Sequence, residues 1–179
     1  MNAPLWVAVP VVVLAVLAAR ADVRTRRIPN LLTGPAILLA LLAHFGFEGF
    51  AGLKGALAGM LIAGGLLLPG WFLKFTGAGD VKLMAGVGAW IQWTNTYNCI
   101  LGFAIIGAVM AICMVLVRGK WKHHYNQFWS IAREIATIKD PEKLSELAAK
   151  RKPTMMLLPY GIPIAVATIG YFLWTGMLI

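Results

Sequence analysis

Two carboxylates stand apart from the other acidic residues of this chain, which has seven Asp and Glu in 179 residues. Asp22 follows the first apolar run, and Asp80 precedes the fourth. An ionisable group placed against hydrocarbon is costly, so by default it marks a functional site. The remaining acidic residues fall in polar connections, where water can hydrate them: Glu48, Glu134, Asp140, Glu142 and Glu146.

Two carboxylates in one cavity can activate water against an amide bond. One ionised Asp accepts a proton from water while the other, protonated, hydrogen-bonds the carbonyl, and like charges held close favour this singly protonated state. This chemistry needs no cofactor, and the absence of a CxxC pair leaves a structural zinc or other metal site without support. A serine mechanism is less favoured, because the only serines, Ser130 and Ser145, have no base arranged around them.

Asp22 lies in the basic segment Arg-Ala-Asp-Val-Arg-Thr-Arg-Arg-Ile-Pro-Asn at 20–30. Pro29 disfavours helical geometry at the residue before it, and Asn30 can cap the next helix. We therefore expect a tight reversal that holds Asp22 near the membrane surface. The alternative role for Asp22 is a structural ion pair with Arg26, its neighbour four residues along a continuing helix.

Asp80 closes the segment Gly77-Ala78-Gly79-Asp80. Two glycines permit backbone angles that other residues avoid, and they remove side chains that would block an approaching peptide. The alternative is a glycine hinge in which Asp80 only caps a helix N-terminus.

The elements that must position these residues are transmembrane helices. The chain is 60% hydrophobic and 13% charged, with a mean hydropathy of +0.77, which an ordinary soluble surface does not allow. Apolar runs cover roughly 4–20, 31–47, 52–73, 81–96, 98–117 and 156–178, near the ~20 residues that one crossing needs. We expect an all-α, polytopic bundle of six transmembrane helices, forming one domain over 1–179. The fourth run is too short for a full crossing. We therefore expect the fourth helix, which begins at Asp80, to start below the headgroups in a water-filled cavity.

The basic residues orient the bundle. With the first connection in the cytoplasm, fifteen of the sixteen Lys and Arg face inward, and only Lys54 and the uncharged stretch 92–98 face outward. This predicts both termini outside and both aspartates at the cytoplasmic edge. The net charge of +9 does not indicate nucleic-acid binding, because the basic residues are spread over short gaps. The first apolar run has no basic residue before it, so we expect a retained helix instead of a cleaved signal.

Two further patterns concern packing. Gly55, Gly59 and Ala63 form a small-residue stripe that lets another helix approach closely. The polar segment 118–153 predicts an amphipathic helix on the inner surface of the lipid bilayer, then a short helix that begins after Asp140. The basic run 150–152 would contact anionic headgroups.

The motifs resemble those of the prepilin peptidases, the type IV prepilin leader peptidases with a GxGD motif. The resemblance rests on Asp22 followed by Arg-Thr-Arg-Arg-Ile-Pro-Asn, on Gly-Ala-Gly-Asp-Val-Lys-Leu at 77–83, and on Pro-Tyr-Gly at 159–161, and it extends over essentially the whole chain. It implies an aspartic endopeptidase of the bacterial inner membrane that removes the basic leader from prepilins and pseudopilins at the cytoplasmic face. The implied catalytic residues are Asp22 and Asp80, and the residues that support the active-site loops are Gly77, Gly79, Lys82, Arg26, Pro29 and Asn30.

The short chain looks like the subgroup that serves Flp (tight-adherence) pili, with the pilus assembly machinery as a candidate partner. It lacks the cysteine-rich region of the larger bifunctional enzymes, so we expect peptidase activity without N-methylation. Two alternatives remain open. One is a small proton-coupled transporter or channel that uses Asp22 and Asp80 as relay groups, although no acidic residue occupies the midplane. The other is a structural subunit of a secretion system.

Overall fold

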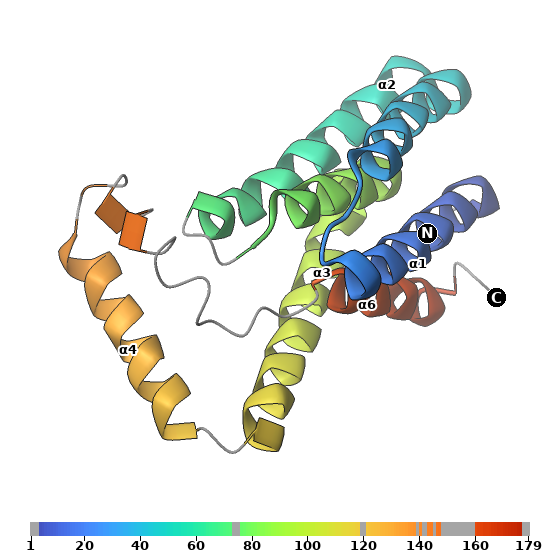
Figure 1. The fold of residues 1–179 in the computed structure, drawn as a ribbon. Coiled ribbons are helices and arrows are strands. Elements are labelled where there is room, and N and C mark those ends of the chain that lie inside the picture. The colour runs from blue at the N-terminus through green and yellow to red at the C-terminus, as the bar shows by residue number, and fades with distance from the viewer. Residues whose placement is uncertain are drawn as a thin grey trace.

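The computed structural model describes residues 4–72, 76–118, 121–138, 140, 143–144, 146–147 and 160–176. All regular structure within these residues is helical, as the composition predicted (Figure 1). The helices, in chain order, are α1 (Leu5–Thr25), α2 (Asn30–Phe72), α3 (Ala78–Arg118), α4 (Trp121–Thr137) and α6 (Gly161–Trp174).

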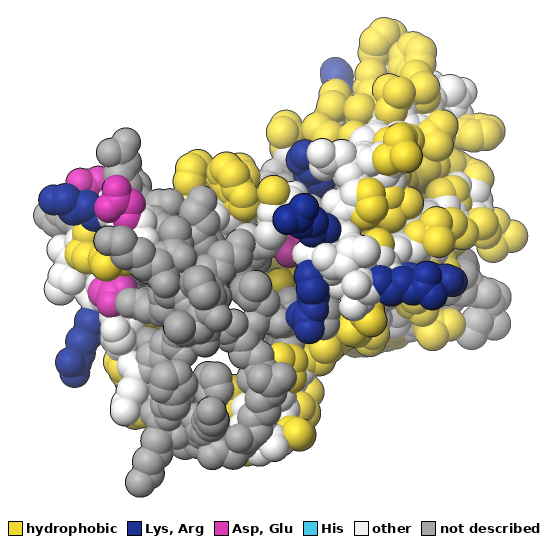
Figure 2. Space-filling model, in the orientation of Figure 1, with side chains coloured by type: hydrophobic (Ala, Val, Ile, Leu, Met, Phe, Trp, Pro, Cys, Tyr) yellow, Lys and Arg dark blue, Asp and Glu magenta, His cyan; other side chains and the backbone are white. Residues whose placement is uncertain are grey.

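The outer surface of the bundle is apolar. Helices α1, α2 and α3 are long and apolar enough to cross a membrane, and α6 is a shorter apolar helix. Hydrophobic side chains cover the surface where α2 lies (Figure 2), among them the exposed Leu38, Leu42 and Leu61. Because so large an apolar surface is not tolerated in water, the chain is a membrane protein.

Helices α2 and α3 are each broken at one residue. Gly49 (φ 66°, ψ −151°) breaks α2, which turns back on itself there (Figure 1). Gln92 (φ 59°, ψ 173°) breaks α3. A glycine adopts such angles freely, whereas a glutamine held there is strained. The first break falls between the second and third apolar runs of the sequence.

The second break lies inside the fourth apolar run of the sequence, 81–96. Residues 93–98 are helical, and only Gln92 departs from helical geometry. The reason is that nearby side chains satisfy the carbonyls at the break. Thr96 Oγ1 donates to the carbonyl of Gln92 (2.5 Å), and Asn95 Nδ2 donates to that of Ile91 (3.3 Å).

Helices α2 and α3 pack at van der Waals contact through small residues. A Cβ atom added to Gly59 would lie 2.2 Å from the carbonyl oxygen of Gly88, and one added to Gly88 would lie 2.7 Å from Ala63 Cβ. The predicted role of the small-residue stripe as a close helix contact is confirmed. Helices α1 and α6 complete the bundle, with a core of Val11, Leu14, Leu83, Met84, Val87, Ile164 and Phe172.

Helix α4 lies apart from the bundle (Figure 1), with Tyr125 and Trp129 exposed. It is the amphipathic helix that the sequence predicted within 118–153. In the predicted short helix that follows, the N–H of Leu144 donates to the carbonyl of Asp140 (3.2 Å), as at a helix start. The basic run 150–152 lies outside the described residues.

We predict that Gly59→Ala lowers the thermal unfolding midpoint of the purified protein in detergent, because the new methyl group must displace the α3 backbone. Overpacking of this kind costs about 1–3 kcal/mol. The matched control is Gly65→Ala in the same helix, where an added Cβ meets nothing within 4 Å. Equal midpoints for the two variants would contradict the close contact between α2 and α3.

Candidate active site

Asp22 lies in the last turn of α1 and is 7% exposed. The helix ends at Thr25, and Arg26 adopts a left-handed conformation (φ 54°) in which its N–H donates to the carbonyl of Asp22 (2.8 Å). The proposed ion pair required α1 to continue through Arg26. It does not, so Arg26 is the C-cap of α1, and the helical i,i+4 geometry of that alternative is wrong.

The carboxylate of Asp22 accepts a hydrogen bond from the start of α6. The N–H of Gly161 donates to Asp22 Oδ2 over 2.9 Å. A Cβ on Gly161 would lie 3.0 Å from Asp22 Cβ and 3.2 Å from Ala19 Cα, so the two helices meet closely only because residue 161 is glycine. The helix N-terminus also favours a negative charge at this point.

The reversal after Asp22 is built differently from the prediction in one detail. Ile28 is non-helical, as expected from the following proline, and it is buried. The carbonyl of Pro29 accepts the N–H of Leu32 (3.0 Å), so Pro29 is the N-cap and Asn30 is the first residue of α2. The Asn30 side chain instead accepts a hydrogen bond from Lys82 Nζ (2.9 Å). The predicted capping role of Asn30 is therefore wrong, because its side chain binds α3.

Asp80 is the third residue of α3 and is 8% exposed. Its N–H donates to the carbonyl of Gly77 (3.1 Å), and its Oδ2 accepts the N–H of Gly77 (2.9 Å). This reciprocal pair resembles a capping box, with Gly77 as the N-cap. Asp80 is thus not the N-cap that the alternative interpretation assumed, although its carboxylate does help to cap the helix.

The two reversals contact each other at one end of the bundle. A Cβ on Gly79 would lie 3.0 Å from Ile28 Cβ and 3.4 Å from its backbone nitrogen, so the start of α3 rests on the segment that follows Asp22. This contact brings the end of α1, with Asp22, and the start of α3, with Asp80, to the same end of the bundle. Gly77, Gly79, Lys82, Arg26, Pro29 and Asn30 all lie in these two reversals or directly beside them.

Tyr160 is a residue at this site that the sequence analysis quoted without assigning it a role. It immediately precedes α6, is half-buried, and packs near the Phe103 ring, with 6.3 Å between centroids. Its partner in the Pro-Tyr-Gly segment, Pro159, lies outside the described residues.

The surface around the site is basic. Lys and Arg side chains gather in the middle of the face shown in Figure 2, and Arg20, Arg24, Arg27 and Lys82 are exposed. A separate cavity of about 520 Å³ beside α4 is lined by Tyr125, Asn126, Trp129, Ser130 and Arg133. That cavity contains neither aspartate, so it is not the candidate site.

The chemistry open to this site follows from how the carboxylates are held. Each uses Oδ2 to accept a backbone N–H, Asp22 from Gly161 and Asp80 from Gly77. Among the described residues, neither Oδ1 atom makes a hydrogen bond. Two nearly buried carboxylates at one end of the bundle are the groups needed to activate water against a carbonyl.

Comparison with known proteins agrees with this arrangement. The model of the type IV leader peptidase family matches residues 9–112, a range that includes both aspartates. Curated relatives named prepilin leader peptidase/N-methyltransferase are 33% identical over 116 residues in Aeromonas hydrophila and 35% over 106 in Pseudomonas aeruginosa. The alignments cover 59% and 54% of this chain but only 38% and 36% of those relatives. No solved structure matches it. This chain belongs to the type IV leader peptidase family.

Proposed function

We propose that this chain is an aspartic endopeptidase of the bacterial inner membrane that removes the leader peptide from type IV prepilins and pseudopilins. The observation that carries the proposal is that Asp22 and Asp80, both nearly buried, lie at the same end of the bundle and within the region that the family model matches. The relatives' printed name, prepilin leader peptidase, supports the substrate class.

In the proposed mechanism, the ionised aspartate accepts a proton from water as the water oxygen attacks the scissile carbonyl carbon. The protonated aspartate hydrogen-bonds the carbonyl oxygen and stabilises the tetrahedral intermediate. The intermediate then collapses and the C–N bond breaks. The leaving amine takes the proton that the first aspartate accepted from water. Gly77 and Gly161 serve this chemistry by holding the Oδ2 atoms in place.

We further propose that the substrates are Flp-type prepilins and that this chain does not methylate the new N-terminus. The second part is supported by cysteine content, because the chain has only Cys99 and Cys113, and both lie within α3. They cannot form the cysteine-rich region that the larger bifunctional enzymes carry.

We also propose that the chain crosses the membrane six times, with both termini outside and the aspartates at the cytoplasmic edge. The support comes from the breaks at Gly49 and Gln92, which divide α2 and α3 into two helical runs each. The bias of Lys and Arg supports the orientation. On this topology the amphipathic α4 rests on the inner membrane surface, with Tyr125 and Trp129 toward the lipid.

We predict that Asp22→Asn and Asp80→Asn each abolish leader removal at normal membrane abundance, because neither carboxylate can both activate water and polarise the carbonyl. Asp→Glu at either position should reduce cleavage by about a hundredfold, since the carboxylate moves by roughly an ångström. The assay is mass spectrometry of a co-expressed Flp-type prepilin, which also shows whether the new N-terminus is methylated. Cleavage by either Asn variant would refute the mechanism and favour a purely structural role.

A second prediction concerns the contact between the reversals. Gly79→Val should lower cleavage strongly while leaving the protein in the membrane, because its side chain must push Ile28 away from α3. The matched control is Gly34→Val near the start of α2, where an added Cβ meets nothing within 4 Å. If both variants cleave like the wild type, the contact at Gly79 does not position Asp80.

The orientation is tested by thiol labelling in a background without Cys99 and Cys113. Single cysteines replace Thr25 and Thr94. Both positions are exposed, and they lie at opposite ends of the bundle. An impermeant reagent applied to intact spheroplasts should label the cysteine at 94 and leave the one at 25 unlabelled until the membrane is opened. The reverse pattern would place both aspartates on the outer side and exclude a cytoplasmic leader peptidase.

A further inference from the structure

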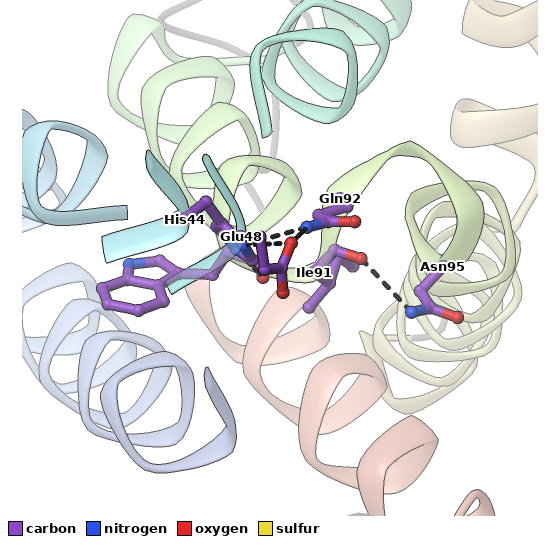
Figure 3. A network of polar contacts seen from close by, with 6 residues as sticks. His44, Glu48, Ile91, Gln92 and Asn95 are labelled. Carbon is purple, nitrogen blue, oxygen red and sulfur yellow. Dashed lines mark hydrogen bonds and ion pairs between the residues drawn. The ribbon is translucent and has the colours of Figure 1, made fainter. Parts of the chain in front are cut away.

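A buried histidine, His44, takes part in a network of polar contacts with Glu48 and Gln92 (Figure 3). It packs near the start of α1, whereas Asp22 lies in the last turn of that helix. His44 of α2 is 2% exposed, and its ring is 5.0 Å from that of Trp6, near the start of α1. Its Nε2 lies 2.9 Å from the carbonyl oxygen of Trp90, and its Nδ1 lies 2.9 Å from Nε2 of Gln92. The proposed peptidase chemistry uses none of these groups.

The contact with Trp90 places a hydrogen on Nε2 of His44. A carbonyl oxygen only accepts, so Nε2 carries a proton and donates to Trp90. With a neutral ring, Nδ1 then accepts one hydrogen of the Gln92 amide. The second amide hydrogen is donated to Glu48 Oε2, which itself lies 3.3 Å from His44 Nδ1. The Gln92 side chain therefore bridges His44 and Glu48.

His44 meets a carbonyl that the break in α3 releases. A helix that stops at Gln92 leaves the preceding carbonyls without N–H partners from its next turn. Side chains bind carbonyls at the break: Asn95 Nδ2 donates to that of Ile91, and Thr96 Oγ1 donates to that of Gln92. Both come from α3 itself. His44 is different, because it ties the released carbonyl of Trp90 to another helix.

The part of α3 before the break, residues 78–91, starts with the turn that contains Asp80. It is a rod of about 20 Å that the break separates from 93–118. Its near end is tied to α2 by the hydrogen bond from Lys82 to Asn30. Its far end is tied to α2 twice, by His44 and by Trp90 Nε1, which donates to the carbonyl of Ala36 (3.0 Å).

We propose that His44 is a positioning residue that holds the far end of the 78–91 rod on α2 and so sets the position of Asp80. The proposal rests on the proposed peptidase function. Because the rod is stiff and separated from the rest of α3, release of one end lets it tilt, and a tilt moves the carboxylate at the other end. A displacement of about 1 Å at a reacting group costs on the order of a hundredfold in rate.

The test compares two variants of His44 whose side-chain amide nitrogen reaches different positions. In His44→Gln the side-chain nitrogen can reach the place of Nε2 and still donate to the carbonyl of Trp90, whereas in His44→Asn it reaches only the place of Nδ1. Tyr171→Phe is the control, because it removes the hydrogen bond from Tyr171 to Asn95 Oδ1 (2.9 Å), which joins α6 to the part of α3 beyond the break. Each protein is measured in nanodiscs for amide hydrogen exchange and for kcat and KM on a prepilin.

His44→Asn should exchange faster over 78–91 than the wild type, and its kcat should fall by roughly ten- to a hundredfold with little change in KM. His44→Gln should recover most of both, and Tyr171→Phe should alter neither 78–91 nor kcat. Unchanged exchange over 78–91 in His44→Asn overturns the clamp, and faster exchange with an unchanged kcat overturns its role in positioning Asp80. A wild-type chain that cleaves no prepilin would overturn the proposed function instead, while the exchange data would still decide whether the clamp exists.

Discussion

The burial of two carboxylates at the rim of an apolar bundle is the constraint on which the rest of this structure depends. An ionised carboxylate taken out of water costs several kcal/mol unless hydrogen bonds replace its hydration. Here each aspartate receives one backbone N–H, from Gly161 for Asp22 and from Gly77 for Asp80. Glycine at 161 also allows α6 to reach the carboxylate of α1. The first and last described helices of the bundle are therefore joined at the atoms proposed to do the chemistry.

The second constraint is the close packing of α2 on α3. Gly59 and Gly88 bring the two backbones into contact, and the strained Gln92 lies within the same contact, because its Cα would be 3.0 Å from a Cβ at Gly59. In lipid, released carbonyls cannot turn to water, so a helix break persists only where protein groups satisfy them. The polar cluster of His44, Glu48 and Gln92 supplies some of these hydrogen bonds. The proposed site and the break thus lie at opposite ends of one short rod.

Much of the fold was predictable because it depends on patterns among residues that are close in sequence. Apolar run lengths predicted the helices, the spacing of Gly55, Gly59 and Ala63 predicted a close helix contact, and Pro29 predicted the reversal at Ile28. What failed depended on partners distant in the chain. Asn30 is a residue type that favours N-caps. Its side chain instead accepts a hydrogen bond from Lys82, which is distant in sequence. The break at Gln92 was not predicted, because the partners of its side chain, His44 and Glu48, lie on another helix.

The same limit applies to the site. The residue types and the family motifs predicted which carboxylates to consider, and the structure brings both to one end of the bundle. No pattern in the sequence indicated that the N–H of Gly161 would bind Asp22. The pair His44 and Glu48, four residues apart, was the one available signal for the opposite cluster, and its partner Gln92 lies on another helix.

The central claim is that Asp22 and Asp80 face one another in a single site within one chain. Cross-linking tests it most directly. Asp22→Cys and Asp80→Cys are combined in a chain without Cys99 and Cys113, treated in membranes with a short bis-thiosulfonate reagent, and analysed by mass spectrometry. The account predicts an intramolecular link between positions 22 and 80, and none when the cysteine at 22 is paired with one at Thr94. Two thiols that each react with a monofunctional reagent, yet never link to one another, would contradict it.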